Sequence, residues 1–600
     1  MKRNEKLTYI TCNAIFQVND YDQARSLLLT IPQSVFKEVS IPALSYYVDA
    51  IKHMYSIANA DQKYFCNVQL ECVMLSLYRD ALKRSIDEEE SKYGPEETEQ
   101  ILGILLIMAE IYSEQGEIIA ENEVKEAIIL IEKQKAKQAE SEQQDLDMAN
   151  SFVKMANTYQ EKREYPSALD YSLRALSIYE RIRGTEHPDT ATIYNNIAGV
   201  YKNMKEYDKA VEYYEKALTI REKVFGTEHS STATTYNNIA TVYQDLNDYS
   251  KAIICYEKAL TIREKALGTE HPDTAITYND IATLYQATGD YSKAKVYYEK
   301  ALAIKEKVLG TDNPSTATTY NNMAGVYKAK GEYDKAINYY EKALVVREKA
   351  LGTEHPATAT TYNNIAGIYK EVCDYDKAME YYEKALAIRE KVFGTEHPAT
   401  ATTYNNIAGV YKEVCDYDKA MEYYEKALGI YKKVLGAEHS YTATTYNNMA
   451  SVYKAMSDYD KAKEYYEKAL DIKLKTLGTE HPSTATTYNN IAGLYQAMGE
   501  YEKAMEYYKK SLDIKLKVLG DEHPLTANTY QNIAGVYEAI SDYDKALEYA
   551  HKAREIYERV FGEDNSKTKG VYTLLSDLYA AKEDHERSHE YAVKAGPDDE

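Results

Sequence analysis

Histidine, a residue type that binds metal ions and transfers protons, returns at one fixed interval along this chain. The interval is 42 residues or a multiple of it, at His187, His229, His271, His355, His397, His439, His481 and His523. Asn313 and Asn565 take the same place in two further copies. If each interval folds as a pair of helices, neighbouring copies stand about 10 Å apart, whereas a metal ion needs ligands about 2 Å away. The pattern therefore predicts caps of helices or turns, and it predicts no metal site.

The other residue types that carry chemistry are scattered. None of the cysteines forms a Cys-x-x-Cys pair, which indicates a reducing compartment and no disulfide framework; they are Cys12, Cys66, Cys72, Cys255, Cys373 and Cys415. The chain has no glycine-rich phosphate loop, nucleophile elbow or His-Glu-x-x-His motif. We therefore expect no catalytic residues, no cofactor and no enzyme activity of its own.

Asparagine and lysine recur at the same interval, and their chemistry suits binding. An amide offers a donor and an acceptor, which match the backbone of an extended peptide, and lysine favours acidic side chains. The predicted peptide-binding residues form two columns, Asn195, Asn237, Asn279, Asn321, Asn363, Asn405, Asn447 and Asn489, and Lys202, Lys328, Lys370, Lys412 and Lys454. The alternative is that these asparagines bond to neighbouring helices, above all the second of each pair, such as Asn364.

A tyrosine fixes the period of the whole array. It stands at Tyr194, Tyr236, Tyr278, Tyr320, Tyr362, Tyr404, Tyr446, Tyr488, Tyr530 and Tyr572, always 42 residues apart. With Phe152 one period upstream, the chain holds about eleven copies. A period in the range of about 20 to 50 residues indicates a solenoid of stacked supersecondary units.

Each copy reads as two amphipathic helices. Apolar and small residues at helical spacing predict one buried stripe on the first helix and one on the second, made of Tyr362, Ile365, Ala366 and Tyr369, and of Ala378, Tyr382, Ala385, Leu386 and Phe393. Gly394 can end the second helix with a positive φ, and Pro398 suits the first turn of the next helix. In the pair Tyr381-Tyr382 one ring is expected to be buried and the other partly exposed.

The candidate binding strip lies beside the buried stripe of the first helix. On a wheel of about 100° per residue, Lys370, Asn363, Gly367 and Thr360 fall at about 80°, 100°, 140° and 160° from Tyr362. Glycine in mid-helix costs about 1 kcal/mol relative to alanine, so its repeated use predicts a close approach by a neighbour or a ligand.

The order Tyr362, Ile365, Ala366, Tyr369, Ala378, Tyr382, Ala385 resembles the signature of the tetratricopeptide repeat family. That family usually repeats every 34 residues, and the longer unit here, with Tyr-Asn-Asn-Ile-Ala and Gly-Thr-Glu-His-Pro, is similar to the kinesin-light-chain type. The resemblance implies an all-α, right-handed superhelical solenoid with the first helices on its concave side. It also implies that concave asparagines and basic residues hold cargo peptides. Residues 1–150 show no sustained heptads, unlike the coiled coil of kinesin light chains.

Three regions follow from the repeat. Residues 1–150 are expected to form an irregular helical N-terminal region, either a degenerate repeat-like cap or a separate small domain; residues 151–595 form the array, with the last copy as a cap; residues 596–600 form a tail. The net charge of −23 is divided between −11 in residues 1–150 and −12 in the rest. The runs Asp87–Glu90 and Glu96–Glu97 dominate the acidic part and are expected to be solvated.

An acidic chain without a basic cluster argues against a nucleic-acid partner. Neither a secretory signal nor an apolar run long enough to span a bilayer is evident, so we expect a cytoplasmic protein without membrane insertion. The favoured function is a non-enzymatic scaffold that binds extended, acidic peptide segments of other proteins in the concave groove. The alternatives are a self-assembling structural solenoid, or a regulatory or sensor subunit that acts through the acidic N-terminal region.

Overall fold

The computed structural model describes residues 8, 11–31, 41–58, 66, 69, 95–115 and 118–596. They divide into two compact units, Met1–Lys154 with Ser177–Ile182, and Met155–Leu176 with Arg183–Glu600. Every regular element in the described ranges is a helix, so the all-α prediction is confirmed. None of the described helices is long and apolar enough to cross a membrane.

The first unit is built from α2 (Tyr21–Leu28), α3 (Ile41–Ile57), α5 (Pro95–Gln115) and the beginning of α6 (Ile118–Glu161). Its core buries Ile15, Tyr47 and Met108. Asp20 caps α2 by accepting the backbone N–H of Gln23 at 2.9 Å. α7 (Tyr165–Arg183) contributes to both units. The acidic run at 87–90 and the tail at 597–600 lie outside the described residues, and a degenerate repeat cap at residues 1–150 stays a prediction.

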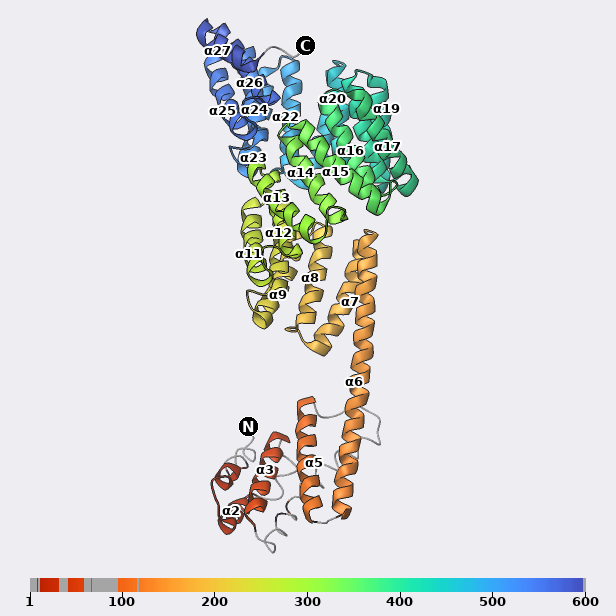
Figure 1. The fold of residues 1–600 in the computed structure, drawn as a ribbon, viewed down its shortest axis with the longest axis vertical. Coiled ribbons are helices and arrows are strands. Elements are labelled where there is room, and N and C mark those ends of the chain that lie inside the picture. The colour runs from red at the N-terminus through yellow and green to blue at the C-terminus, as the bar shows by residue number, and fades with distance from the viewer. Residues whose placement is uncertain are drawn as a thin grey trace. The chain divides into compact units, whose positions relative to one another are not determined.

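The second unit is a row of helical hairpins (Figure 1). The first helices are α8 (Pro188–Asn203), α10 (Ser230–Asp245), α12 (Pro272–Ala287), α14 (Pro314–Ala329), α16 (Pro356–Glu371), α18 (Pro398–Glu413), α20 (Ser440–Ala455), α22 (Pro482–Ala497), α24 (Pro524–Ala539) and α26 (Ser566–Ala581). The second helices are α9 (Tyr207–Phe225), α11 (Tyr249–Leu267), α13 (Tyr291–Val308), α15 (Tyr333–Leu351), α17 (Tyr375–Phe393), α19 (Tyr417–Val434), α21 (Tyr459–Leu477), α23 (Tyr501–Val518), α25 (Tyr543–Phe561) and α27 (His585–Ala595).

The ends of these helices follow from local chemistry. Nδ1 of His355 accepts the backbone N–H of Ala357 at 3.1 Å, and Pro356 opens α16 where no amide donor is needed. Asn313 makes the same cap on α14 through its Oδ1 at 2.8 Å. The capping role predicted for the repeated histidines is therefore confirmed. Gly394 ends α17 with a φ of 86°, as predicted.

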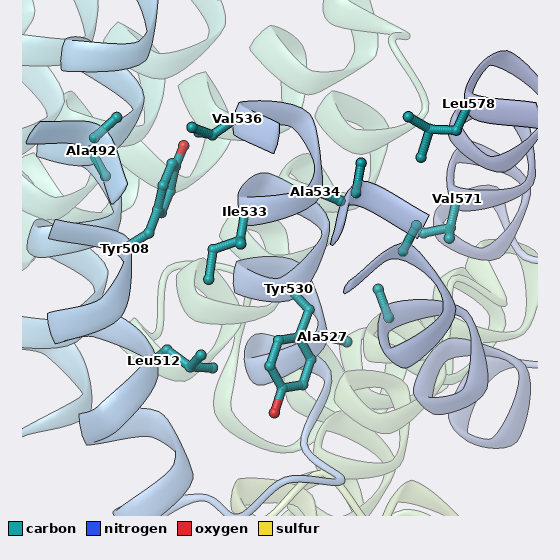
Figure 2. Close-up of a cluster of buried hydrophobic side chains, with 14 of the residues drawn as sticks. Ala492, Tyr508, Leu512, Ala527, Tyr530, Ile533, Ala534, Val536, Val571 and Leu578 are labelled. Carbon is teal, nitrogen blue, oxygen red and sulfur yellow. The ribbon is translucent and has the colours of Figure 1, made fainter. Parts of the chain in front are cut away.

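Each hairpin buries small and aromatic residues against its neighbours. Ile365, Ala366, Ala378, Tyr382 and Ala385 are all buried, as the two stripes predicted. Figure 2 shows the corresponding layer near the C-terminus, where residues of three successive first helices and of one second helix meet around α24. The alanines permit the close approach of helices that larger side chains would prevent.

Two expectations for single positions have different outcomes. Tyr381 is partly exposed beside the buried Tyr382, as predicted. Phe393 was expected in the buried stripe, but 39% of it is exposed and its ring stacks on His397 at 4.4 Å. The prediction for Phe393 is wrong because this residue lies in the last turn of α17, beside the inter-repeat turn and not between two helices.

Candidate peptide-binding groove

The first helices of successive repeats follow one another closely along the array. Successive first helices touch one another directly, for example α12 with α14 and α16 with α18. We call the positions equivalent to Thr360, Asn363, Gly367 and Lys370 the groove face. Asn363, Gly367 and Lys370 are partly buried and Thr360 is exposed, so this face is open to a ligand.

The asparagines of the groove face form a ladder between repeats. Nδ2 of Asn364 donates to Oδ1 of Asn321 in the preceding repeat at 3.0 Å, and Asn406 donates to Asn363 at the same distance. The same bond joins five other steps: Asn238 to Asn195, Asn322 to Asn279, Asn448 to Asn405, Asn490 to Asn447 and Asn532 to Asn489. The alternative kept open for these asparagines, bonding to a neighbouring helix, is therefore realised for both columns.

The ladder uses only part of each amide. Among the described residues, Nδ2 of Asn363 has no hydrogen-bond partner. This atom is not buried, so solvent or a ligand can reach it. The same holds for Nδ2 of Asn321 and Asn405. In these three copies the first asparagine therefore presents two N–H donors to the groove, and donors of this kind select a carbonyl or carboxylate oxygen.

One step of the ladder is reversed. Asp280 stands where other copies have the second asparagine, and Nδ2 of Asn237 donates to its carboxylate at 2.9 Å. Asn237 is only 7% exposed, and its Oδ1 is left buried without a partner. Burial raises the pKa of Asp280, against the hydrogen bond from Asn237 and the charge of Arg263. Asn237, predicted as a binding residue, is thus buried at a defective step, because a carboxylate has no N–H with which to continue the ladder.

The lysine column lies over the glycines of the next repeat. A methyl group placed on Gly367 would lie 3.2 Å from Nζ of Lys328 and 3.6 Å from the hydroxyl of Tyr382. On Gly409 it would lie 3.5 Å from Nζ of Lys370. The predicted close approach at these glycines is therefore real, and it is made by the lysine of the preceding repeat. Where glutamine replaces lysine, as at Gln496, its Oε1 accepts the hydroxyl of Tyr508 at 3.0 Å.

A second row of cations bonds to the buried threonines that directly follow those of the groove face, such as Thr403 after Thr402. Arg389 donates from Nη1 to the carbonyl of Ala399 at 3.0 Å and to Oγ1 of Thr403 at 2.7 Å. The same pair of bonds is made by Arg221, Arg263, Lys305, Arg347, Lys473 and Lys515, and all seven are buried. Tyrosine takes the place at 431 and 557.

Among the described residues these cations have no carboxylate partner, unlike the lysines of the outer surface. Among the described residues, no carboxylate oxygen lies within 4 Å of the charged nitrogen atoms of the seven buried cations. The same is true of Nζ of Lys328, Lys370 and Lys454. On the second helices, by contrast, Lys384 pairs with Glu380 at 2.6 Å. Burial lowers the pKa of Lys328, and it lowers the pKa of Lys473 and of Lys515 to about 8.

A cavity of about 460 Å³ opens on the groove face near the C-terminal end of the lysine column. Lys454 reaches into it from α20, Gln496 and Asn489 line it from α22, and Asn532 lines it from α24. Burial, together with the charge of Lys412, lowers the pKa of Lys454. The cavity is therefore rich in N–H donors and carries an unpaired positive charge.

Comparison with known families decides the class of this array. The tetratricopeptide repeat model matches eight segments that run from near the start of the second unit almost to the C-terminus: residues 147–223, 189–265, 231–307, 315–391, 358–433, 441–517, 483–559 and 525–595. The chain belongs to the tetratricopeptide repeat (TPR) family. This confirms the family predicted from the sequence. No curated protein matches the chain.

Several solved TPR-like structures are similar to parts of the chain. BtubC (BKLC) from P. vanneervenii is 26% identical, with 39% of this chain and 92% of that chain covered and a TM-score of 0.32. A Podosopora anserina protein described as a putative kinesin light chain with nearly identical TPR-like repeats is 27% identical, with 34% and 98% covered and a TM-score of 0.30. Yeast Tom70 is 15% identical, with 75% and 91% covered and a TM-score of 0.39.

Most of the predicted residues of the TPR array share one face. The asparagine column and the lysine column run side by side along the first helices, except that Asn237 is buried and Lys202 is held by Thr241 at 2.9 Å. Sequence reasoning missed the buried cations. The available signal was a basic residue 27 positions after seven of the repeat tyrosines, as at Arg389, within an otherwise apolar stripe. No group of residues in the described ranges has the composition and spacing to hold a metal ion.

Proposed function

We propose that the TPR array is a non-enzymatic scaffold that binds an extended acidic segment of another protein along the groove face. The observation that carries the proposal is the set of cations without carboxylate partners on and under this face. The chain as a whole has a net charge of −23. Lysines of its outer surface are nevertheless paired, whereas Lys328, Lys370 and Lys454 in the groove have no such partner among the described residues.

The neutral groups of the groove favour the same ligand. Free N–H groups of Asn321, Asn363 and Asn405 donate to oxygen atoms, so backbone carbonyls and carboxylates both fit. Repeats about 10 Å apart accommodate roughly three residues of an extended chain each. A segment of about twelve residues therefore spans the four consecutive lysines, from Lys328 to Lys454.

The test uses a fluorescein-labelled peptide of twelve glutamates and the full chain, with fluorescence anisotropy at low and at physiological salt. The groove variant changes three unpaired lysines to glutamine, the residue that already occupies this column at Gln244, Gln286 and Gln496. Its changes are Lys328→Gln, Lys370→Gln and Lys454→Gln.

A matched control removes the same charge from the outer surface by Lys384→Gln, Lys426→Gln and Lys468→Gln. We expect the groove variant to lose at least about tenfold in affinity, or about 1.4 kcal/mol, and the control to bind like the wild type at physiological salt. Equal losses in both variants would show that net charge alone drives binding. That result, or a wild type that ignores the peptide at low salt, would refute the proposal. A pull-down with the same three proteins then identifies the natural partner.

A further inference from the structure

The array coils back upon itself, so that repeats far apart in the sequence touch. Nδ2 of Asn565 donates to the carbonyl of Lys330 at 2.7 Å, and the rings of Tyr291 and Phe561 stack at 6.1 Å. Figure 1 shows the start of α13 close to α23. In each contact, the turn inside a hairpin meets the inter-repeat turn of a later hairpin.

Glycine marks the places where these turns approach most closely. The residue just before the N-cap of each second helix has a positive φ. Most copies place a residue other than glycine there, for example Asn247 with a φ of 59°. The other types used are arginine, lysine, cysteine, serine and glutamate. At Gly289, however, a methyl group would lie 2.8 Å from Cδ of Pro524, and at Gly331 it would lie 2.6 Å from Nδ2 of Asn565. At these two positions the close contact, and not the backbone conformation, requires glycine.

Gly499 is the third glycine at this position, and nothing in the fold explains it. Its φ is 76°, close to that of Gly289, yet no atom of the described residues, other than those of the adjacent residues, lies within 4 Å of the place where a methyl group would stand. Other copies adopt the same φ with larger residues. Gly499 is therefore exposed and leaves uncovered the position that Pro524 and His523 cover at Gly289.

The complementary turns are also uncovered elsewhere in the chain. His523 is only 5% exposed where it meets Gly289, but the side chain of His271 is 40% exposed and His355 is exposed as well. Both are followed by proline, as His523 is. The inter-repeat edge of the early repeats thus offers the same His-Pro turn without a partner.

Apolar residues flank both free edges. Phe225, at the end of a second helix, is 44% exposed, whereas its equivalent Phe561 is partly covered by the ring of Tyr291. On the edge that carries Gly499, Met456 and Ile540 are 47% and 48% exposed. A contact between the two edges would cover these side chains in the way that the internal contact covers Phe561.

We propose that a second copy of this chain docks on the Gly499 edge, with a His-Pro turn of its early repeats seated on Gly499. The contact repeats between molecules the packing that Gly289 and His523 make within one molecule. The contact joins two different surfaces, so it is head-to-tail. Its repetition gives short filaments, unless the rotation from one copy to the next closes the assembly into a ring.

The test measures the mass of the full chain by light scattering over a concentration series. The variant Gly499→Asn places a side chain over this position with a residue that tolerates positive φ, as Asn247 does. The control Ser457→Asn introduces asparagine on the same edge at a position without glycine. We expect the wild type and Ser457→Asn to exceed the monomer mass of 68.4 kDa as concentration rises. Gly499→Asn should need at least about tenfold higher concentration.

Cross-linking of a mixture of ¹⁴N- and ¹⁵N-labelled chains identifies the contact itself. Mixed-isotope cross-links are expected between peptides that contain Gly499 and peptides that contain His187, His271 or His355. A wild type that stays at the monomer mass throughout would overturn the proposal, as would assembly unaffected by Gly499→Asn or mixed-isotope links confined to other surfaces. The outcome is independent of peptide binding in the groove.

Discussion

Replacing Asp280 with asparagine is expected to stabilise the repeats around it. The new amide can donate to Oδ1 of Asn237, which is buried without a partner in the wild type, and so continue the ladder in the direction of the other seven steps. The change also removes a carboxylate whose pKa is raised by burial.

The magnitude follows from two opposing effects. A buried acceptor without a hydrogen bond costs about 1–3 kcal/mol, and Asp280→Asn removes this cost. The carboxylate, however, is attracted to the charges of Arg263 and Lys305. Losing this attraction cancels part of the stabilisation. We expect a net stabilisation of about 1 kcal/mol, which lowers the population of the locally opened state about fivefold.

The pH dependence gives an independent check of the cause. Because the pKa of Asp280 is raised in the folded protein, the folded state binds a proton more readily than the unfolded chain. At neutral pH the charged carboxylate of Asp280 therefore destabilises the folded state. This destabilisation is lost as the pH falls through the pKa that Asp280 has in the folded protein, toward its pKa in the unfolded chain. The advantage of Asp280→Asn should shrink on acidification over that range.

Hydrogen exchange is the suitable assay, because the stability of a repeat array is local. Amides of α10 and α12 should exchange about fivefold more slowly in Asp280→Asn. The mirror variant Asn322→Asp places the same defect one repeat further on, and it should speed exchange in α12 and α14. Faster exchange in Asp280→Asn, or no change in Asn322→Asp, would refute the view that the ladder stabilises the array.

Three other substitutions or conditions test the remaining parts of the site. Arg389→Leu should destabilise its repeat by about 1–3 kcal/mol in hydrogen exchange, because two buried acceptors lose their donor, whereas Arg389→Tyr should cost less, since the array already holds tyrosine in this row at Tyr431. His355→Ala should destabilise α16 by about 1 kcal/mol through loss of its cap, and His355→Asn should keep the exchange rate of the wild type. Affinity for the glutamate peptide should fall as the pH rises through about 8, where Lys473 and Lys515 lose their charge; constant affinity in anisotropy would exclude a contribution from them.

The hairpins and their ends could be predicted because their causes are local. The spacing of Ile365, Ala366 and Tyr382 sets a buried stripe, and the cap at His355 involves atoms two residues apart in the chain. Chemistry of this range is visible in one repeat. The periodic recurrence of the tyrosine then extends the conclusion to the whole array.

The ladder could not be assigned because it depends on the register between helices of different repeats. Asn364 and Asn321 are 43 residues apart, and the sequence does not state which amide faces which. For the same reason the wheel placed Asn237 on the groove face, although the carboxylate of Asp280 in the next repeat draws it into a buried bond. The coiling that joins Gly289 to His523 depends on small angles summed over several repeats.

The row of buried cations favours a functional over a structural explanation. A charge buried without a counter-ion costs stability, so its repetition in seven copies needs a reason. The fold does not require the charge, because Tyr431 stands in the same row, and its hydroxyl lies 2.9 Å from Oγ1 of Thr402. A neutral side chain that bonds within its own hairpin, from α19 to α18, is therefore tolerated in this row. What arginine and lysine add is positive potential under the groove face. Arg263 and Lys305 share theirs with Asp280, whereas the other buried cations have no carboxylate within ion-pair distance among the described residues, which supports the proposed acidic ligand.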